Sequence, residues 1–116
     1  MSDLPAPDPV PPIPVVEFAD PVRLLEAIAD PVRYEVLKDL ASGAYYTPSD
    51  LAKRHRIAVD NMSKHLRVLR ARGAVHLVRP EKADGRAQYY QIPQRFRQTT
   101  DTGRPLLDYG VCVIRF

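Results

Sequence analysis

The chain has 116 residues, which is the usual size of a single domain. Lysine and arginine total 17 and aspartate and glutamate 14, and 45% of the residues are apolar, so the composition excludes a disordered acidic chain, a collagen and a coiled coil. A single cysteine, Cys112, excludes an intramolecular disulfide and favours a reducing compartment. Because no apolar run reaches the roughly 18 residues that cross a bilayer and no signal peptide is recognisable, we expect a cytoplasmic protein with no membrane partner.

Basic residues are concentrated in the middle of the chain. Residues 1–52 carry a net charge of −6, residues 53–86 carry +7 and residues 87–116 carry +2. A strongly basic segment inside a nearly neutral protein is typical of a surface that binds a polyanion such as nucleic acid. The alternative for such a charge run is a solvated face without a partner.

The predicted elements begin after a proline-rich segment. Six of the 12 prolines fall within residues 1–14, so we expect a disordered, extended tail there. Two near-repeats, 19–23 and 29–33, then place Asp at a helix N-cap and Pro at the first helical position. They predict helices over about 21–28 and 31–41, with Gly43 ending the second. The apolar residues offered to a core are Leu24, Leu25, Ile28, Val32, Val36, Leu37 and Leu40.

A second pair of helices follows. Thr47-Pro48 is another helix start and predicts a helix over about 48–55, after a very short strand at Tyr45-Tyr46. A tight turn over 56–58 leads to a helix from about Val59 to Arg72, closed by Gly73. Its apolar face consists of Val59, Met62, Leu66 and Leu69. The opposite face is polar and mainly basic.

After Gly73 the apolar pattern changes to alternation, which predicts two strands. The runs 75–80 and 86–92 flank Asp84-Gly85, a hairpin signal. Two short helices joined by a tight turn, with a basic second helix and then a hairpin, form a winged helix-turn-helix. The fold class expected is therefore mainly α with a small β-hairpin (α+β). We assign the tail to residues 1–14, the DNA-binding winged domain to 15–97 and a C-terminal extension to 98–116.

Three stretches resemble ArsR-type winged helix-turn-helix regulators. Residues 29–40 (ADPVRYEVLKDL) resemble the helix that opens their core, and 49–53 with 61–73 (NMSKHLRVLRARG) resemble their helix-turn-helix. Residues 85–90 (GRAQYY) resemble their wing return strand. The resemblance covers about residues 22–93 and implies a dimeric bacterial or archaeal transcription factor, usually a repressor that an effector releases from its operator.

The chain departs from the family pattern in three places. Residues 46–50 (YTPSD) stand where metal-sensing members carry a cysteine pair. A short turn over 93–97 replaces the usual long C-terminal helix. The recognition helix opens with Ala58-Val59-Asp60 where small hydroxyl residues are usual; Ala58 is a poor N-cap, and Asp60 repels phosphate unless it accepts a hydrogen bond from a cytosine amino group.

The second helix of the helix-turn-helix carries the candidate base-reading residues. Asn61, Lys64 and Arg67 share one exposed face near its start, the end that usually enters the major groove. Hydroxyls and basic residues around them are candidates for phosphate contacts, and His65 is a candidate for either DNA contact or a structural hydrogen bond. The DNA-binding candidates together are Thr47, Ser49, Lys53, Val59, Asp60, Asn61, Ser63, Lys64, His65, Arg67, Arg79, Lys82 and Arg86. Arg54 and Arg70 are further phosphate candidates.

No pattern of residues indicates catalysis or a metal. The chain has no nucleophile–base arrangement, no glycine-rich phosphate loop and no carboxylate cluster, so we expect no enzyme and no cofactor. The histidines at 55, 65 and 76 lack the spacing of a metal site. Cys112 is expected to be a small buried apolar residue, with redox sensing as the alternative.

The last segment predicts a strand over 106–116 that is apolar on both faces, which indicates burial on both. We expect this strand and the first helix to replace the missing dimerisation helix. The dimerisation candidates are Leu24, Leu25, Ile28, Tyr109, Val111 and Val113.

The sequence thus predicts a regulator that binds specific double-stranded DNA as a homodimer, a repressor without the cysteine metal-sensing motif, and it assigns no effector. A winged helix that binds only protein, or one that binds RNA, remains an alternative.

Overall fold

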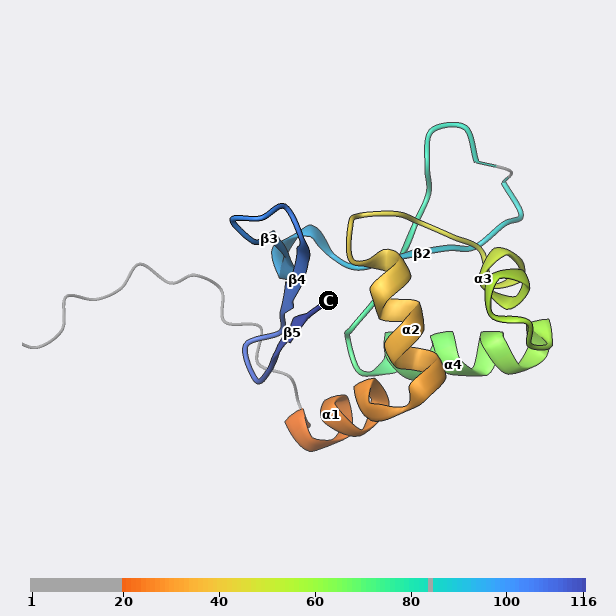
Figure 1. Ribbon diagram of the computed structural model, residues 1–116. Helices are drawn as coiled ribbons and strands as arrows, with labels where there is room; N and C mark the ends of the chain where they lie inside the picture. Colours follow the sequence, from red (N-terminus) through yellow and green to blue (C-terminus); the bar gives the residue numbers. More distant parts are fainter. Residues whose placement is uncertain (1–19, 84) are drawn as a thin grey trace, which may run out of the picture.

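The computed structural model describes residues 20–83 and 85–116 (Figure 1). Four helices come first, α1 (Pro21–Ala29), α2 (Pro31–Leu40), α3 (Pro48–His55) and α4 (Val59–Ala71), followed by the strands β1 (His76–Val78) and β2 (Tyr89–Gln91). A short 3-10 helix, η1 (Gln94–Phe96), leads to β3 (Arg97–Thr99), β4 (Pro105–Asp108) and β5 (Val113–Arg115). The tail predicted over residues 1–14 lies outside the described residues. No helix in the described part of the chain has the length and apolar character that crossing a bilayer requires.

The helix starts form by the capping chemistry that the sequence predicts. The Asp20 side chain accepts from the backbone N–H of Arg23, and the Asp30 side chain accepts from those of Val32 and Arg33. Thr47 and Asp50 form a reciprocal capping box at α3, with both hydrogen bonds at 3.1 Å. No side chain caps α4, as expected from Ala58. Each cap satisfies backbone N–H groups that a helix start leaves without partners.

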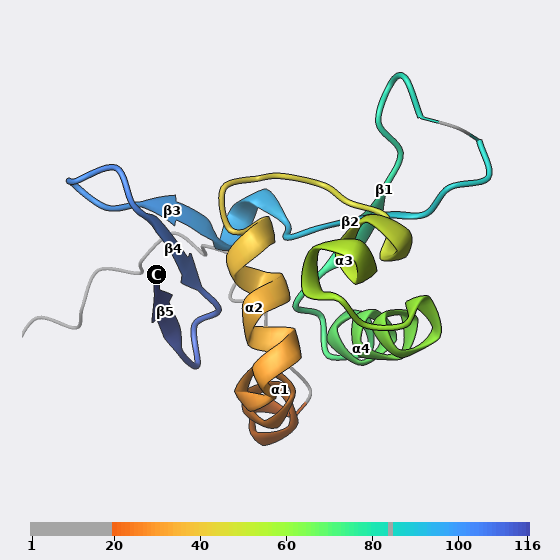
Figure 2. The same ribbon diagram turned by 45° about the vertical axis from the view of Figure 1, so that its right-hand side comes forward.

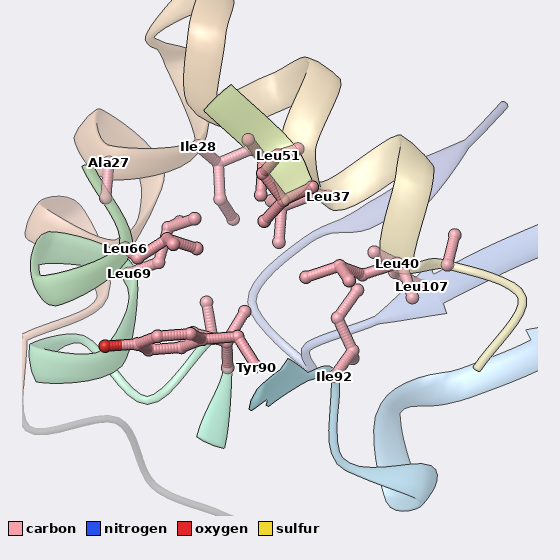
Figure 3. Packing of buried hydrophobic residues seen from close by; sticks show 14 of the residues in the cluster. Ala27, Ile28, Leu37, Leu40, Leu51, Leu66, Leu69, Tyr90, Ile92 and Leu107 are labelled. Carbon is pink, nitrogen blue, oxygen red and sulfur yellow. The ribbon is translucent and has the colours of Figure 1, made fainter. Parts of the chain in front are cut away.

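Helix α2 lies at the centre of the molecule. Figure 2 shows α3 and α4 on one side of α2 and the three C-terminal strands on the other. The buried side chains from all these elements form one cluster, part of which Figure 3 shows around Leu37 and Leu40 of α2. Two of the apolar residues predicted to enter the core stay exposed: Leu25 at 42% and Val59 at 46%. Val59 is the first residue of α4, so it precedes the part of the helix that packs against the core.

The wing is a hairpin, as predicted, but its ladder is shorter. Strands β1 and β2 pair antiparallel from His76↔Gln91 to Val78↔Tyr89, and Tyr46 adds an isolated bridge to Tyr90. Residues 79–83 and 85–88 lie beyond the ladder and form no paired strand. Pro80 has no N–H to donate, so the ladder cannot continue through it.

The prediction of a single strand over residues 106–116 is wrong. The chain reverses direction between β4 and β5, which pair with each other and, through β4, with β3 in a three-stranded antiparallel sheet. Gly110 adopts a positive φ of 84° in the turn, and the Asp108 side chain accepts from its N–H at 2.8 Å. Because of this turn, Tyr109 is buried while Val111 and Val113 are exposed at 44% and 50%. The segment is therefore not apolar on two buried faces.

The three-stranded sheet belongs to the same core as the helices. Leu107 of β4 is fully buried in the core cluster, and the Tyr109 hydroxyl donates to the carbonyl of Ala74 at 3.1 Å. Burial raises the pKa of the Tyr109 phenol, so this donor stays protonated. At the chain end, the ring of Phe116 lies 5.6 Å from that of Tyr34 on α2. Along the chain, this sheet follows the wing, where the family pattern has a long C-terminal helix.

Candidate nucleic-acid interface

The outer face of α4 is polar and open to solvent. Met62, Leu66 and Leu69 are fully buried and hold the helix on the core. Asn61, Lys64 and Arg67 lie on exposed positions of α4, where the sequence placed the base-reading candidates. A helix held by one apolar face and presenting a polar, basic face has the form that a major groove admits.

Figure 1 places the elements that carry most of the other DNA-contact candidates on the same side of the molecule as α4. Helices α3 and α4 and the loop of the wing lie together at one side, and the three-stranded sheet lies at the opposite side. The start of α4 points toward the side of the wing. The remaining exposed candidates on α3, at the start of α4 and in the wing loop are Ser49, Lys53, Val59, Asp60, Arg79, Lys82 and Arg86.

Most of the basic side chains on this side have no acidic partner. Within residues 20–83 and 85–116, no ion pair or side-chain hydrogen bond engages Lys53, Arg56, Lys64, Arg70, Arg79 or Lys82. The Arg67 Nε donates only to the carbonyl of Ser63, at 3.4 Å. The surface therefore carries uncompensated positive charge, which attracts phosphate through long-range steering.

One hydroxyl candidate, Thr47, is partly engaged within the protein. The Thr47 Oγ1 accepts from the N–H of Asp50 in the capping box, which leaves its own proton free to donate to an acceptor. Ser63 is half-buried on α4. The capping bond orients the Thr47 hydroxyl at the start of α3, the first helix of the helix-turn-helix.

Arg54 connects α3 to α2 through Asp39, and its phosphate role stays a prediction. Asp39 of α2 accepts from Arg54 at 3.3 Å and pairs with the His55 Nε2 at 2.5 Å. The Arg54 guanidinium also lies over the Tyr46 ring, 5.1 Å from its centroid. The hydrogen bond and the charge of Asp39 raise the pKa of Arg54. Sequence reasoning missed Asp39, because its partners lie 15 and 16 residues away.

His65 makes the structural hydrogen bond that was one of the two roles predicted for it, and its role in DNA contact stays a prediction. Its Nδ1 lies 3.0 Å from a guanidinium nitrogen of Arg33, and the Arg33 Nε donates to the carbonyl of Ala27 at 2.7 Å. Because arginine has no acceptor, Nδ1 must be the acceptor and a neutral His65 carries its proton on Nε2. Arg33 thus ties the end of α1 to α4.

Asp30 completes this connection. It caps α2 and lies 3.9 Å from both the Arg33 guanidinium and the His65 Nδ1. Partial burial opposes ionisation of the Asp30 carboxyl, but the N–H of Arg33, the positive charge of Arg33, the electrostatic interaction with His65 and the N–H of Val32 together lower its pKa. The sequence indicated the cap but not the link to α4.

The dimerisation candidates fall into two groups. Leu24, Ile28 and Tyr109 are buried in the protein's own core, so their side chains already pack within one chain. Leu25, Val111 and Val113 are exposed. The prediction of a dimer contact therefore rests on these last three residues.

Neither a metal cluster nor a reactive thiol is evident in the part of the chain that the structure describes. No group of three or more His, Cys, Asp and Glu side chains lies together there. Cys112 is half-buried. Burial and then the charge of Asp108 raise the pKa of its thiol, which keeps the sulfur protonated and weakly nucleophilic.

Comparisons with known proteins agree with this geometry. A family model described as a helix-turn-helix domain matches residues 28–78. A possible transcriptional regulator for arsenical resistance is 33% identical, with a TM-score of 0.54 over 63% of this chain and 71% of that one. An ArsR family transcriptional regulator is 30% identical, with a TM-score of 0.53 over 64% and 71%. No curated protein sequence matches at a significant level.

A third solved structure links the fold to an assembly. The homodimeric winged helix-turn-helix DNA-binding domain of a possible ArsR-family regulator from Mycobacterium bovis is 28% identical, with a TM-score of 0.53 over 61% of each chain. The helix order, the wing and these similarities define a winged helix-turn-helix protein. The chain belongs to the ArsR family of transcriptional regulators.

Proposed function

We propose that this protein is a homodimeric repressor that binds a specific double-stranded DNA operator. The observation that carries the proposal is the exposed face of α4, where Asn61, Lys64 and Arg67 lie beside basic residues without acidic partners. Amide, ammonium and guanidinium groups are the donors that read the edges of adenine and guanine in the major groove. The similarity to a homodimeric DNA-binding domain supports the same assembly for this chain.

The wing and α3 supply contacts to the DNA backbone. Lys53 on α3 and Arg79 and Lys82 in the wing loop are exposed on the side of the molecule that holds α4. Such contacts fix the position of a protein on the duplex without reading its sequence. In the dimer, the two α4 helices would lie about 34 Å apart, one turn of B-DNA, so the operator is expected to be a palindrome with that half-site spacing.

Leu25, Val111 and Val113 provide an exposed apolar surface for the second subunit. Leu25 lies on α1, Val111 lies in the turn between β4 and β5, and Val113 is the first residue of β5. Removing them from water in a dimer would be favourable at about 25 cal/mol for each Å² of apolar area. A repressor acts by occupying its operator, so any ligand that separates α4 from the groove would relieve repression.

Gel retardation on random-sequence duplex DNA across salt concentrations tests the proposal. Neutralisation of phosphates releases counterions, so the logarithm of the binding constant should fall linearly with the logarithm of salt concentration. Duplex RNA should compete poorly, because its deep, narrow major groove excludes a helix. Absence of binding at low salt, or equal competition by duplex RNA, would contradict DNA binding through α4.

A further inference from the structure

A pocket of about 440 Å³ lies between α2 and α4. Its lining residues are Val32, Arg33, Ile57, Asn61, Lys64, His65 and Val68. Three of these side chains are branched and apolar, and they come from α2, from the turn before α4 and from α4 itself. Pockets that bind small molecules combine mostly apolar walls with a few polar groups, over about 300–1,000 Å³.

Arg33 offers unused hydrogen-bond donors in this pocket. Arginine has five N–H donors, and only two are engaged here, one by the Ala27 carbonyl and one by His65. The other guanidinium nitrogen makes a longer ion pair with Asp30, at 3.9 Å. The Arg33 side chain is 18% exposed, and its bonds to α1 and α4 hold the guanidinium in place. A preorganised donor of this kind loses little conformational entropy when it binds a ligand.

The remaining polar groups also favour an anion. Lys64 is exposed and has no ion-pair partner within the described residues, while His65 keeps Nε2–H as a donor when Arg33 occupies Nδ1. Asp30 is an acidic residue that lies next to Arg33 and His65, and its Oδ1 already accepts the two N–H groups that it caps at the start of α2. Guanidinium and ammonium groups together bind anions, and a carboxylate can accept from both.

We propose that this pocket binds a small carboxylate with a compact apolar body and so acts as the effector site of the regulator. Arg33 and Lys64 hold the carboxylate, and Val32, Ile57 and Val68 cover the apolar body. The regulatory half of this inference rests on the proposed function, because Asn61 and Lys64 line the pocket and are also candidates for reading bases. A ligand that engages Lys64 removes it from the groove, so carboxylate binding and operator binding are mutually exclusive.

Benzoate and its neutral isostere benzamide test the pocket on the full chain without DNA. We expect benzoate to shift the backbone amide NMR signals of residues around 32–33, 57 and 61–68, and benzamide to bind about tenfold or more weakly, since a hydrogen bond to a charged group exceeds a neutral one. Lys64→Gln should weaken benzoate binding about tenfold. Lys38→Gln, on an exposed part of α2 outside the pocket, should leave it unchanged.

A variant with a filled pocket distinguishes ligand binding from DNA binding. Val68→Trp places a large side chain in the pocket and should abolish the benzoate shifts while retaining binding to duplex DNA. In the unmodified protein benzoate should raise the apparent Kd for DNA, and in Val68→Trp it should not. Equal binding of benzoate and benzamide, or shifts elsewhere on the chain, would overturn the site. Benzoate binding without any effect on DNA affinity would overturn its effector role alone. Failure of the unliganded protein to bind DNA would overturn the proposed function and with it the effector role, while the carboxylate site would still stand or fall on the benzoate and benzamide result.

Discussion

The repeated Asp-Pro-Val-Arg motif allows a matched test of the Arg33 connection. Arg23 and Arg33 occupy the same position after an N-capping aspartate, but Arg23 makes only an exposed ion pair with Asp20 at 3.4 Å. Arg33 makes hydrogen bonds of 2.7 and 3.0 Å to Ala27 and His65. We predict that Arg33→Met, which keeps the apolar stem and removes the donors, destabilises the fold far more than Arg23→Met.

The size of the effect follows from these contacts. Each hydrogen bond from a charged group contributes about 1.5–3 kcal/mol. Because the Arg33 side chain remains 18% exposed, we take the lower part of that range and expect a loss of about 3–4 kcal/mol from its two bonds. For a domain of this size that lowers Tm by about 10–20 °C. Arg23→Met is expected to change the free energy of unfolding by no more than about 0.5 kcal/mol.

Urea and thermal denaturation followed by circular dichroism, at one protein concentration for all variants, measures the difference. The Arg23→Met variant controls for the loss of positive charge next to an N-cap. Equal stability of the two variants would refute the conclusion that Arg33 links α1 to α4.

Three further predictions concern the cap, the dimer and the wing. The lowered pKa of Asp30 means that its charge stabilises the fold above the ordinary carboxyl pKa. Asp30→Asn should therefore lower the free energy of unfolding at pH 7, and its difference from wild type should shrink as pH falls through the folded-state pKa. A pH-independent difference in the free energy of unfolding would contradict this. Replacing the exposed Val111 and Val113 together by glutamate should give folded monomers in sedimentation, and an unchanged dimer would remove the hairpin from the interface. Lys82→Ala in the wing should weaken binding to all duplex sequences alike and reduce the salt slope by about 1 per contact; loss confined to one operator position would instead indicate base reading.

Local signals were sufficient to predict the helices. Asp20-Pro21, Asp30-Pro31 and Thr47-Pro48 act within one turn of chain, and α1, α2 and α3 begin at the residues these caps predict. The period of α4 identified Met62, Leu66 and Leu69 as its buried face. The order of helices, tight turn and hairpin was then enough to predict the winged helix-turn-helix.

Contacts between distant residues were not predictable in this way. Arg33 and His65 are 32 residues apart, and nothing local in either segment indicates that they meet. At the C-terminus, alternating valines favour one long strand, but the chain turns at Gly110. Side-chain pattern defines which residues can form a strand, but a glycine with positive φ decides where the strand ends.

The central claim is that the exposed face of α4 reads base edges, and comparative DNA affinity tests it most directly. An operator selected from a random duplex pool and an unselected duplex would be titrated with wild type, Lys64→Ala, Arg67→Ala and the control Lys38→Ala. The account predicts that the two α4 variants lose about 1–3 kcal/mol of affinity for the operator and little for the unselected duplex, with relaxed specificity at one or two positions. Affinity equal to wild type on the operator, or an equal loss on both duplexes, would contradict base reading by this face.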